Sequence, residues 1–386
     1  MSNRIALHEP KMNSEDEFFV LDALRSHWVS TAGPYVNQFE QEFAAYTGMK
    51  HAISVCNGTA GLALAVDCVA RMRNVGKSYC VLVPTLSFAA TWNAVIQAGG
   101  IPIPIDTAPS SVNMDLNQIK IALTNNFVKQ SSGWHHKTLG IPLLAVLPAH
   151  ILGWACPSDE VKEFLDDAAI PMIEDAAEAL GSRYLNGKHV GHHGLASVFS
   201  FNGNKILTTG GGGMLVTNDD VLAKRAKHLA TTAKTDSLRF VHDEPGYNFR
   251  MVNMLAALGC SQLRRLDSNL ALKAKIASDY HNATSAMTAV TLYTQKNCNG
   301  NNWINTVTFS TEARRESCLA DLNEHGIEAR PLWTPLHLLP YYPKQSVLQD
   351  KFPNAEKCWK TMLSLPSSPQ LTAVEFKKTI DIVAKH

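Results

Sequence analysis

The sequence predicts an α/β protein with a large domain, built on a mixed, mostly parallel sheet flanked by helices, and a smaller C-terminal α+β domain. Two observations predict this. Short apolar runs alternate with helical patterns through the first two-thirds of the chain, as in sheets covered on both faces. The last third has its own strand-like and helical stretches. We expect an N-terminal arm over 1–15, the large domain over 16–265 and the small domain over 266–386.

Seven apolar runs predict the strands of the large domain, and the stretches between them predict its helices. Two examples of such helices are 60–73, AGLALAVDCVARMR, and 88–99, FAATWNAVIQAG. The runs have the length of buried strands and end at polar or turn-forming residues. They lie at 51–55, 79–84, 101–106, 143–148, 171–175, 197–201 and 212–218.

The region 252–285 predicts long helical structure that carries the chain from the large domain to the small one. In the small domain, TLYTQ and NWINTVTFS predict strands, whereas ESCLADLNEHG and AVEFKKTIDIVAKH predict helices. The polar, turn-rich stretch 125–140 predicts a surface insertion.

The composition excludes several classes of protein. The 386 residues carry a formal net charge of +1, with 45% hydrophobic and 18% charged residues, so no nucleic-acid or membrane surface is indicated. Eight cysteines are scattered without C-x-x-C spacing, which predicts free and mostly buried thiols. The N-terminus MSNRIALHEP lacks the apolar stretch of a signal peptide. We therefore expect a cytoplasmic protein.

The residues that follow the predicted strands are the candidates for chemistry, because ligands of open α/β sheets bind at the carboxyl ends of strands. Asn57-Gly58-Thr59-Ala60 lies between a strand and a helix, where a tight turn and free N–H groups suit a phosphate. An ordinary helix cap explains the same pattern. Phe88, after the strand 79–84, suits stacking on a flat ring, although ordinary core packing explains it as well.

An acid and a lysine complete the set. Asp175 ends the strand PMIED, where a carboxylate suits a protonated ring nitrogen; a helix cap is the competing interpretation. Lys205 follows the strand SVFSF and precedes TTGGGGM, and Ser200 at that strand's end offers a hydroxyl to a phosphate. Each signal alone is weak. A phosphate turn, an aromatic, an acid and a lysine in this order match the parts of a pyridoxal-phosphate (PLP) site.

The chain resembles the DegT/StrS sugar aminotransferases, which are fold-type I PLP enzymes. The resemblance runs from LHEP near the start to RPLWTPLHLLPYY near the end. The form SFNGNK with TTGGGGM is most similar to the branch that aminates UDP-linked 4-keto-6-deoxy-N-acetylhexosamines. The other matching stretches are STAGPYVNQFEQEFAAYTG, CNGTAGLALA, VPTLSFAATWNAV, IEDAAEALGS and GYNFRMVNMLAALGCSQL.

The resemblance implies a role for each matching residue. Lys205 matches the Schiff-base lysine that also moves protons, and Asp175 matches the acid at the pyridine nitrogen. Glu178 stands where many relatives have Gln or His near the cofactor's ring oxygen, which predicts a raised pKa for its carboxyl. The phosphate cradle matches Gly58, Thr59, Ala60 and Ser200, the ring-stacking aromatic matches Phe88, and the phosphate ligand from the neighbouring subunit of a homodimer matches Asn248.

The resemblance also implies a reaction. We expect transfer of the amino group of L-glutamate to a nucleotide-linked 4-keto-6-deoxy sugar, with Arg250, Arg330 and His337 contacting the sugar nucleotide. A 3-keto sugar nucleotide, a cyclitol ketone, and a catalytically silent binding relative remain alternatives. No metal site is predicted, because the loop histidines His135-His136, His189 and His192-His193 lack the spacing of a ligand set.

Overall fold

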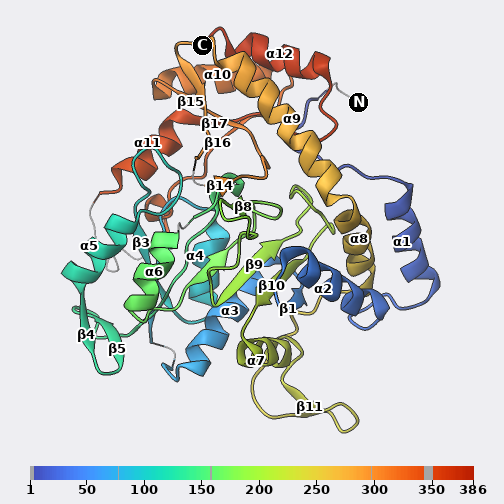
Figure 1. Ribbon diagram of the computed structural model, residues 1–386, viewed down its shortest axis with the longest axis vertical. Coiled ribbons are helices and arrows are strands. Elements are labelled where there is room, and N and C mark those ends of the chain that lie inside the picture. Colours follow the sequence, from blue (N-terminus) through green and yellow to red (C-terminus); the bar gives the residue numbers. More distant parts are fainter. Residues whose placement is uncertain (1–3, 77, 157–158, 297, 343–350) are drawn as a thin grey trace.

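The computed structural model describes residues 4–76, 78–156, 159–296, 298–342 and 351–386 (Figure 1). Its centre is a four-stranded sheet of order β1-β10-β9-β7 beside a three-stranded sheet of order β3-β2-β6. Parallel bridges from Val146 to Met172 and from Ala149 to Asp175 join the two sheets between β6 and β7. These strands are β1 (His51–Val55), β2 (Cys80–Pro84), β3 (Ile101–Ile105), β6 (Leu143–Val146), β7 (Ile173–Asp175), β9 (Ala196–Ser200) and β10 (Gly213–Thr217).

The strand directions confirm the mixed, mostly parallel sheet. β2 runs parallel to β3 and β6, and β7 runs parallel to β9, whereas β10 runs antiparallel to both β9 and β1. β1 therefore points the same way as β9 and β7. The carboxyl ends of these three strands meet at one edge, which is where the candidate residues of the sequence lie.

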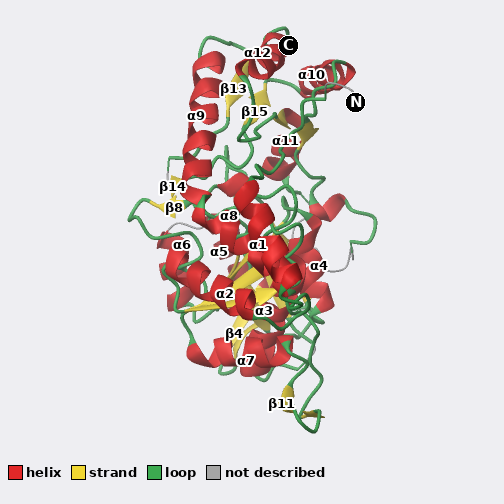
Figure 2. Ribbon diagram, turned by 90° about the vertical axis from the view of Figure 1, so that its right-hand side faces the viewer, coloured by secondary structure: helices red, strands yellow, loops and turns green. Residues whose placement is uncertain are grey.

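Helices enclose this sheet because its strands are apolar on both faces (Figure 2). α3 packs against β9 and β10, α2 against β1, and α4 against β2 and β3. Asn57 caps α3, since its Oδ1 accepts a hydrogen bond from the N–H of Ala60 over 2.8 Å. The helices of this region are α1 (Ser14–Arg25), α2 (Pro34–Thr47), α3 (Gly58–Met72), α4 (Ala89–Gln97), α5 (Leu116–Asn126), α6 (Asp159–Asp167), α7 (Asp220–Ala230) and α8 (Asn253–Arg264).

The small domain has an antiparallel sheet of order β13-β15-β17-β16, covered by helices (Figure 1). Its strands are β13 (Val290–Leu292), β15 (Thr306–Phe309), β16 (Arg330–Pro331) and β17 (Met362–Ser364), and its helices are α9 (Leu266–Thr284), α10 (Glu312–Glu324), α11 (Pro353–Thr361) and α12 (Ala373–Val383). Ile5 near the N-terminus pairs with Ile327 of this domain. The predicted fold class is confirmed, while the exact domain boundaries stay a prediction.

Three segments differ in detail from the structure that the sequence predicts. The predicted helical region 252–285 is two helices, because the chain leaves helical geometry at Arg265 between α8 and α9. The polar stretch 125–140 forms the hairpin of β4 (Phe127–Gln130) and β5 (Gly133–His136). The expected strand NWINTVTFS is shorter, since only β15 pairs and Trp303 lies in the preceding loop.

Two short two-stranded pairings and two 3-10 turns are further features of the described residues. β8 (Arg183–Tyr184) pairs with β14 (Cys298–Asn299), and β11 (Lys234–Asp236) pairs with β12 (Val241–His242) in a projecting hairpin (Figure 1). Short 3-10 turns occupy Ile151–Gly153 and Leu336–Leu338. All eight cysteines are free and seven are buried, which confirms that expectation. Among the described residues, no helix is both long and apolar enough to cross a bilayer.

Candidate active site

A cavity of about 310 Å³ opens at the edge where β1, β7 and β9 end. Seven residues predicted from the sequence line it: Gly58, Thr59, Phe88, Asp175, Glu178, Ser200 and Lys205. Ala60 lies just beside it, buried in the first turn of α3 with its N–H bound by Asn57. The parallel strands thus bring together groups that lie up to 147 positions apart in the chain, from Gly58 to Lys205.

The turn before α3 forms a narrow cradle. A Cβ on Gly58 would lie 3.0 Å from the Cβ of Ser200, and a Cβ on Gly213 would lie 2.9 Å from the backbone N of Gly58. Only glycine at these two positions lets β10 and the end of β9 approach the start of α3. The cradle joins the N-terminus of α3 to two hydroxyl side chains, those of Thr59 and Ser200, which is a donor set suited to a phosphate.

Asp175 is fixed by two donors at the end of β7. Thr91 of α4 donates its hydroxyl to Oδ2 of Asp175 over 2.7 Å, and the N–H of Ala177 donates to Oδ1 over 3.1 Å. The hydroxyl of Ser87 lies 2.6 Å from that of Thr91. Burial raises the pKa of Asp175, and the hydrogen bonds from Thr91 and Ala177 oppose this rise. The side chain is therefore an oriented carboxylate with little access to solvent.

Lys205 faces Glu178 across the cavity. The Nζ of Lys205 lies 3.5 Å from Oε1 of Glu178, and both side chains are largely buried. Burial raises the pKa of Glu178, whereas the charge of Lys205 lowers it, and the net shift is upward as the sequence predicts. The other oxygen, Oε2, accepts the N–H of Leu152 over 2.8 Å. A carboxyl whose pKa is raised by burial thus lies beside the lysine amine.

Aromatic rings form the remaining walls. Phe88 is the N-cap residue just before α4 and is 55% exposed at the cavity mouth, edge-on to Trp333 with 6.4 Å between ring centroids. Trp303 is buried and also lines the cavity. An exposed ring beside an apolar cavity is available to a flat ligand, which is unlike a core phenylalanine.

The four other predicted residues do not line this cavity in the single chain. Asn248 and Arg250 contact each other, and Arg250 lines a second cavity of about 320 Å³ near Gly33 and Ser54. Arg330 is exposed and paired with Glu328, while His337 lies between Thr85 and Glu356. Asn248 is predicted to contact the cofactor of a neighbouring subunit, so its role stays a prediction. The substrate roles of Arg250, Arg330 and His337 stay predictions.

Sequence reasoning missed five cavity or supporting residues. His150 follows the strand 143–148 and thus satisfied the strand-end rule that found the others. Thr91 and Ser87 flank Phe88 in a segment already singled out, but hydroxyls in a first helical turn usually act as caps. Trp303 and Trp333 come from the C-terminal part, where no local pattern reveals proximity to β7 and β9.

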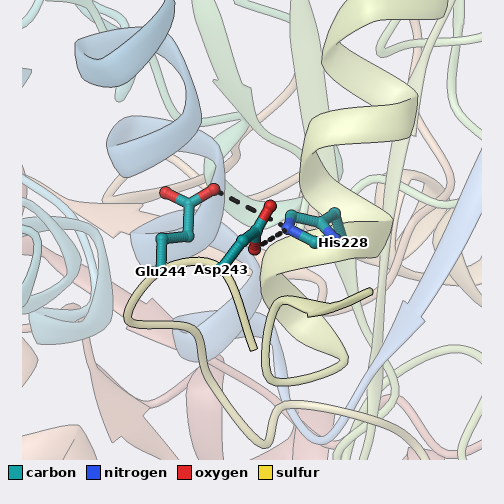
Figure 3. A group of neighbouring side chains, drawn as sticks. All are labelled: His228, Asp243 and Glu244. Carbon is teal, nitrogen blue, oxygen red and sulfur yellow. Dashed lines mark hydrogen bonds and ion pairs between the residues drawn. The ribbon is translucent and has the colours of Figure 1, made fainter. Parts of the chain in front are cut away.

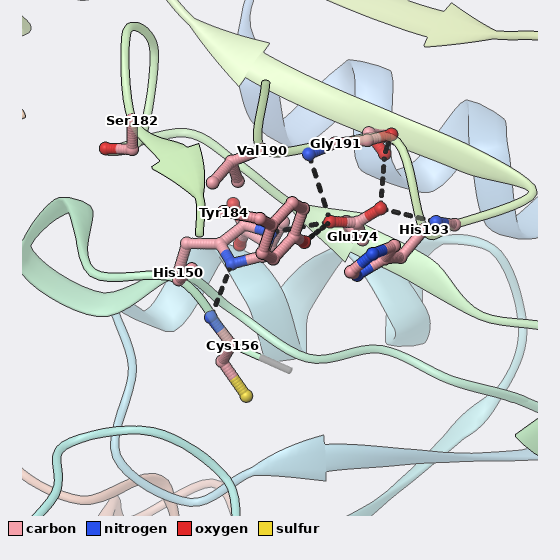
Figure 4. A network of polar contacts seen from close by, with 12 residues as sticks. His150, Cys156, Glu174, Ser182, Tyr184, Val190, Gly191 and His193 are labelled. Carbon is pink, nitrogen blue, oxygen red and sulfur yellow. Dashed lines mark hydrogen bonds and ion pairs between the residues drawn. The ribbon is translucent and has the colours of Figure 1, made fainter. Parts of the chain in front are cut away.

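Glu174, which precedes Asp175 in β7, lies within a buried network of polar contacts (Figure 4). Oε2 of Glu174 accepts hydrogen bonds from His150 Nε2 over 2.8 Å and from Tyr184 over 3.0 Å. Oε1 accepts from Ser197 over 3.2 Å. Burial would raise the pKa of Glu174, but the hydrogen bond from His150 and other donors outweigh it and lower the pKa to about 2. The network fixes the backbone that presents Asp175.

The substitution Glu174→Gln should therefore lower the free energy of unfolding by about 3 kcal/mol at pH 7. The folded pKa is about 2, and the unfolded value is about 4.3. The stabilisation by the ionised form is hence present above the unfolded pKa and is lost as pH falls through the folded one. Urea unfolding at several pH values should show the difference from the native chain shrinking below about pH 4.3. Glu163→Gln, at an exposed position, is the control; a pH-independent loss would contradict the assignment.

His228, Asp243 and Glu244 are a group within the described residues that has the spacing of metal ligands (Figure 3). His228 Nε2 lies 2.8 Å from Oδ1 of Asp243. However, Glu244 already accepts from the guanidinium groups of Arg71 over 2.6 Å and Arg225 over 2.7 Å. Two fixed positive charges on this carboxylate oppose a cation, so the group is an ion-pair cluster.

Comparisons with known proteins show the family to which the chain belongs. The family model described as the DegT/DnrJ/EryC1/StrS aminotransferase family matches residues 10–384. The chain is 33% identical over 386 residues to EpsN of Bacillus subtilis (strain 168), provisionally named a pyridoxal phosphate-dependent aminotransferase, covering 99% of this chain and 96% of that protein. It is 32% identical over 381 residues to GDP-perosamine synthase of Caulobacter vibrioides, covering 98% and 96%.

A solved structure supports the fold. PseC of Helicobacter pylori, described as an aminotransferase involved in the biosynthesis of pseudoaminic acid, superposes with a TM-score of 0.88. The two chains are 23% identical, and the match covers 99% of each. The architecture is therefore that of the fold-type I aminotransferases, as the sequence predicts.

Proposed function

Because the chain belongs to the DegT/DnrJ/EryC1/StrS aminotransferase family, it is a PLP-dependent aminotransferase, and we propose that it aminates a nucleotide-linked 4-keto-6-deoxy sugar with L-glutamate as donor. The observation that supports this most is the meeting of Lys205, Asp175, Glu178 and the Gly58–Ser200 cradle in one cavity. A catalytically silent relative would have no need to bury these charged groups together.

The residues present fit the cofactor. The cradle at the start of α3 would hold its phosphate, Phe88 would lie against its ring, and Asp175 would hold the proton of its pyridine nitrogen. When bound, PLP would supply an aldehyde carbon that takes up the amino group and a ring that withdraws electrons. Asp175 would keep the ring nitrogen protonated, because Thr91 and Ala177 favour the ionised form of its carboxyl.

Lys205 is the group that we assign to bond formation and proton movement. Its amine would hold the cofactor covalently at rest and, once released as a free amine, would take the proton from the α-carbon of the amino donor and pass it on within the site. Glu178 lies 3.5 Å from the Nζ of Lys205, within reach to steady the amine in its released position. The apolar walls around the cavity limit the access of water to the reacting groups.

A nucleotide-sugar substrate is supported by relatives that span almost the whole chain. GDP-perosamine synthases of Caulobacter vibrioides and Vibrio cholerae are 32% and 30% identical to it. A Streptomyces venezuelae relative, 30% identical, is named for a dTDP-linked 3-amino sugar. The nucleotide and the position of the keto group are therefore what an experiment must decide.

The test begins with the protein converted to its amino form by glutamate and freed of excess glutamate. UDP-, GDP- and dTDP-linked 4-keto-6-deoxy sugars are then added separately, and the absorbance of the lysine-bound cofactor is followed. Return of that absorbance with one of them supports the proposal and identifies the nucleotide. Return only with a 3-keto sugar nucleotide or a cyclitol ketone would refute the 4-keto assignment while leaving the aminotransferase activity intact.

We further propose that the chain acts as a homodimer in which Asn248 reaches the cofactor phosphate of the neighbouring subunit. Phe18, Leu21 and Leu24 of α1 and the nearby Trp28 are all more than 40% exposed, which is unusual for an apolar surface without a partner. Sedimentation equilibrium should give twice the mass of 42.2 kDa, and a monomer would contradict the proposed dimer.

The substitution Asn248→Ala should weaken the retention of PLP. Unchanged retention would contradict the role proposed for Asn248.

A further inference from the structure

The indole ring of Trp303 lies directly against the amine of Lys205. The Nζ of Lys205 is 4.1 Å from the centroid of the ring, a distance at which a cation is attracted to the face of an aromatic ring. Trp303 is only 2% exposed, so water competes little with this contact. Tryptophan is the aromatic side chain that attracts cations most strongly.

Glu178 forms the second contact of the amine, over 3.5 Å. The two contacts differ in chemistry. The carboxylate attracts the ammonium, and its oxygens can accept a hydrogen bond or a proton from it. The ring attracts the ammonium but has no basic atom facing it, because the only polar group of indole is a donor. Trp303 therefore holds a charged amine in place without competing for its proton.

Trp303 is tied through both its ring and its backbone to the segments that carry Lys205 and Glu178. Its Nε1 donates to the carbonyl of Asn204, the residue before Lys205, over 2.7 Å. Its N–H donates to Oδ1 of Asn301 over 2.9 Å, and the amide of Asn301 donates to the carbonyl of Glu178 over 2.8 Å. Asn301 thus links the segments that carry the Trp303 ring and the Glu178 carboxylate, which both contact the amine of Lys205.

The buried Lys273 of α9, in the small domain, also holds Trp303 in place. Its Nζ donates to the carbonyl oxygens of Trp303 and Ser367, and its side chain is completely buried. Almost all of the other cavity walls come from the large domain, whereas Trp303 enters with the loop before β15. The ring is thus anchored in both domains, which makes it a rigid surface for the lysine.

We propose that Trp303 is a positioning residue for Lys205, whose ring face holds the released side chain beside Glu178, both before its amine takes the proton of the amino donor and after that proton has made it an ammonium. The inference rests on the proposed role of Lys205 as the residue that binds the cofactor. In that reaction the lysine loses its bond to the cofactor and must remain close to the reacting carbon to move a proton. A long, flexible side chain without such a surface spreads over many conformers and spends less time within reach.

The experiment compares Trp303→Phe, which keeps a ring but loses the donor to Asn204, with Trp303→Met, which has no ring. In single-turnover reactions with glutamate, Trp303→Met should be about tenfold slower than the native protein, and Trp303→Phe should lie between them. Deuterium at the α-carbon of glutamate should slow Trp303→Met more than the native protein, because proton transfer to Lys205 becomes the slower step. A variant that is merely less well folded would bind less cofactor without changing this isotope effect.

A second readout needs no cofactor. In the apoprotein, acetic anhydride should label Lys205 about threefold faster in Trp303→Met than in the native protein, because the ring no longer covers and holds the amine. The exposed Lys224 is the internal standard within each sample, and mass spectrometry measures both. Equal labelling rates and equal isotope effects in the native protein and Trp303→Met would overturn the inference.

Two controls separate this outcome from failure of the proposed function. Borohydride reduction of the native protein should attach the cofactor to the peptide that contains Lys205; attachment elsewhere would refute the proposed function itself. If Trp303→Met does not fold, the same two measurements on Trp303→Phe test the inference. Its labelling rate and isotope effect should then exceed those of the native protein, and identical values would overturn the positioning role.

Discussion

Replacing Lys205 by alanine should lower the rate of amino transfer by at least about 10³-fold, which is the range of a lost general acid–base group. The side chain reaches the cavity from the turn after β9, and Glu178 and Trp303 contact its Nζ. No other lysine lines the cavity among the described residues, so none is placed to substitute for it. The absorbance of the lysine-bound cofactor should be absent from the variant, and glutamate turnover should be close to background.

Matched variants distinguish the positive charge of Lys205 from the ability of its amine to form a covalent bond. Lys205→Arg keeps a cation near Glu178 but has no amine that forms a bond with an aldehyde, so it should be as inactive as Lys205→Ala. Lys224→Ala, at an exposed position on α7, should keep native activity. A small primary amine added to Lys205→Ala should restore part of the rate. Native turnover in Lys205→Ala would contradict the assignment.

The strand ends show how far the sequence alone leads. Apolar runs located β1, β7 and β9 to within about two residues, because buried strands are apolar along their whole length. Parallel strands then bring their carboxyl ends together, so Gly58, Asp175 and Lys205 could be placed at one site without a structure. The phosphate turn and the acid needed only this rule and the ordinary chemistry of their side chains.

The supporting residues depend on contacts that no local pattern encodes. Thr91 is one hydroxyl in the first turn of α4, and only the packing of α4 against the end of β7 shows that it serves Asp175. Trp303 lies 98 positions after Lys205, in a loop where the sequence predicted a strand. Asn248 is further removed, because its predicted partner is the cofactor of another subunit. Residues that take part in the reaction were therefore easier to predict from the sequence than residues that hold them in position.

Asp175→Asn should slow the reaction with glutamate by about 10²- to 10³-fold while the protein remains folded. The amide is close in shape to the carboxylate, and Thr91 and Ala177 remain to orient it. It carries no charge, however, and so does not keep the ring nitrogen protonated. Single-turnover absorbance measurements give the rate, and far-UV circular dichroism checks the fold. A rate within threefold of the native protein, about 0.7 kcal/mol in barrier height, would mean that another group serves the ring nitrogen.

The pH dependence provides a more specific test of the same residue. Burial raises the pKa of Asp175, and the Thr91 hydroxyl opposes that rise by donating to the ionised form. Because the reaction requires the ionised form, Thr91→Val should move the acid limb of the pH–rate profile to higher pH, and Asp175→Asn should remove that limb. The apoprotein of Asp175→Asn should also unfold at an equal or higher temperature than the native apoprotein, since a buried charge that function requires costs stability. An acid limb that stays in place in Thr91→Val would show that a different group controls the reaction at low pH.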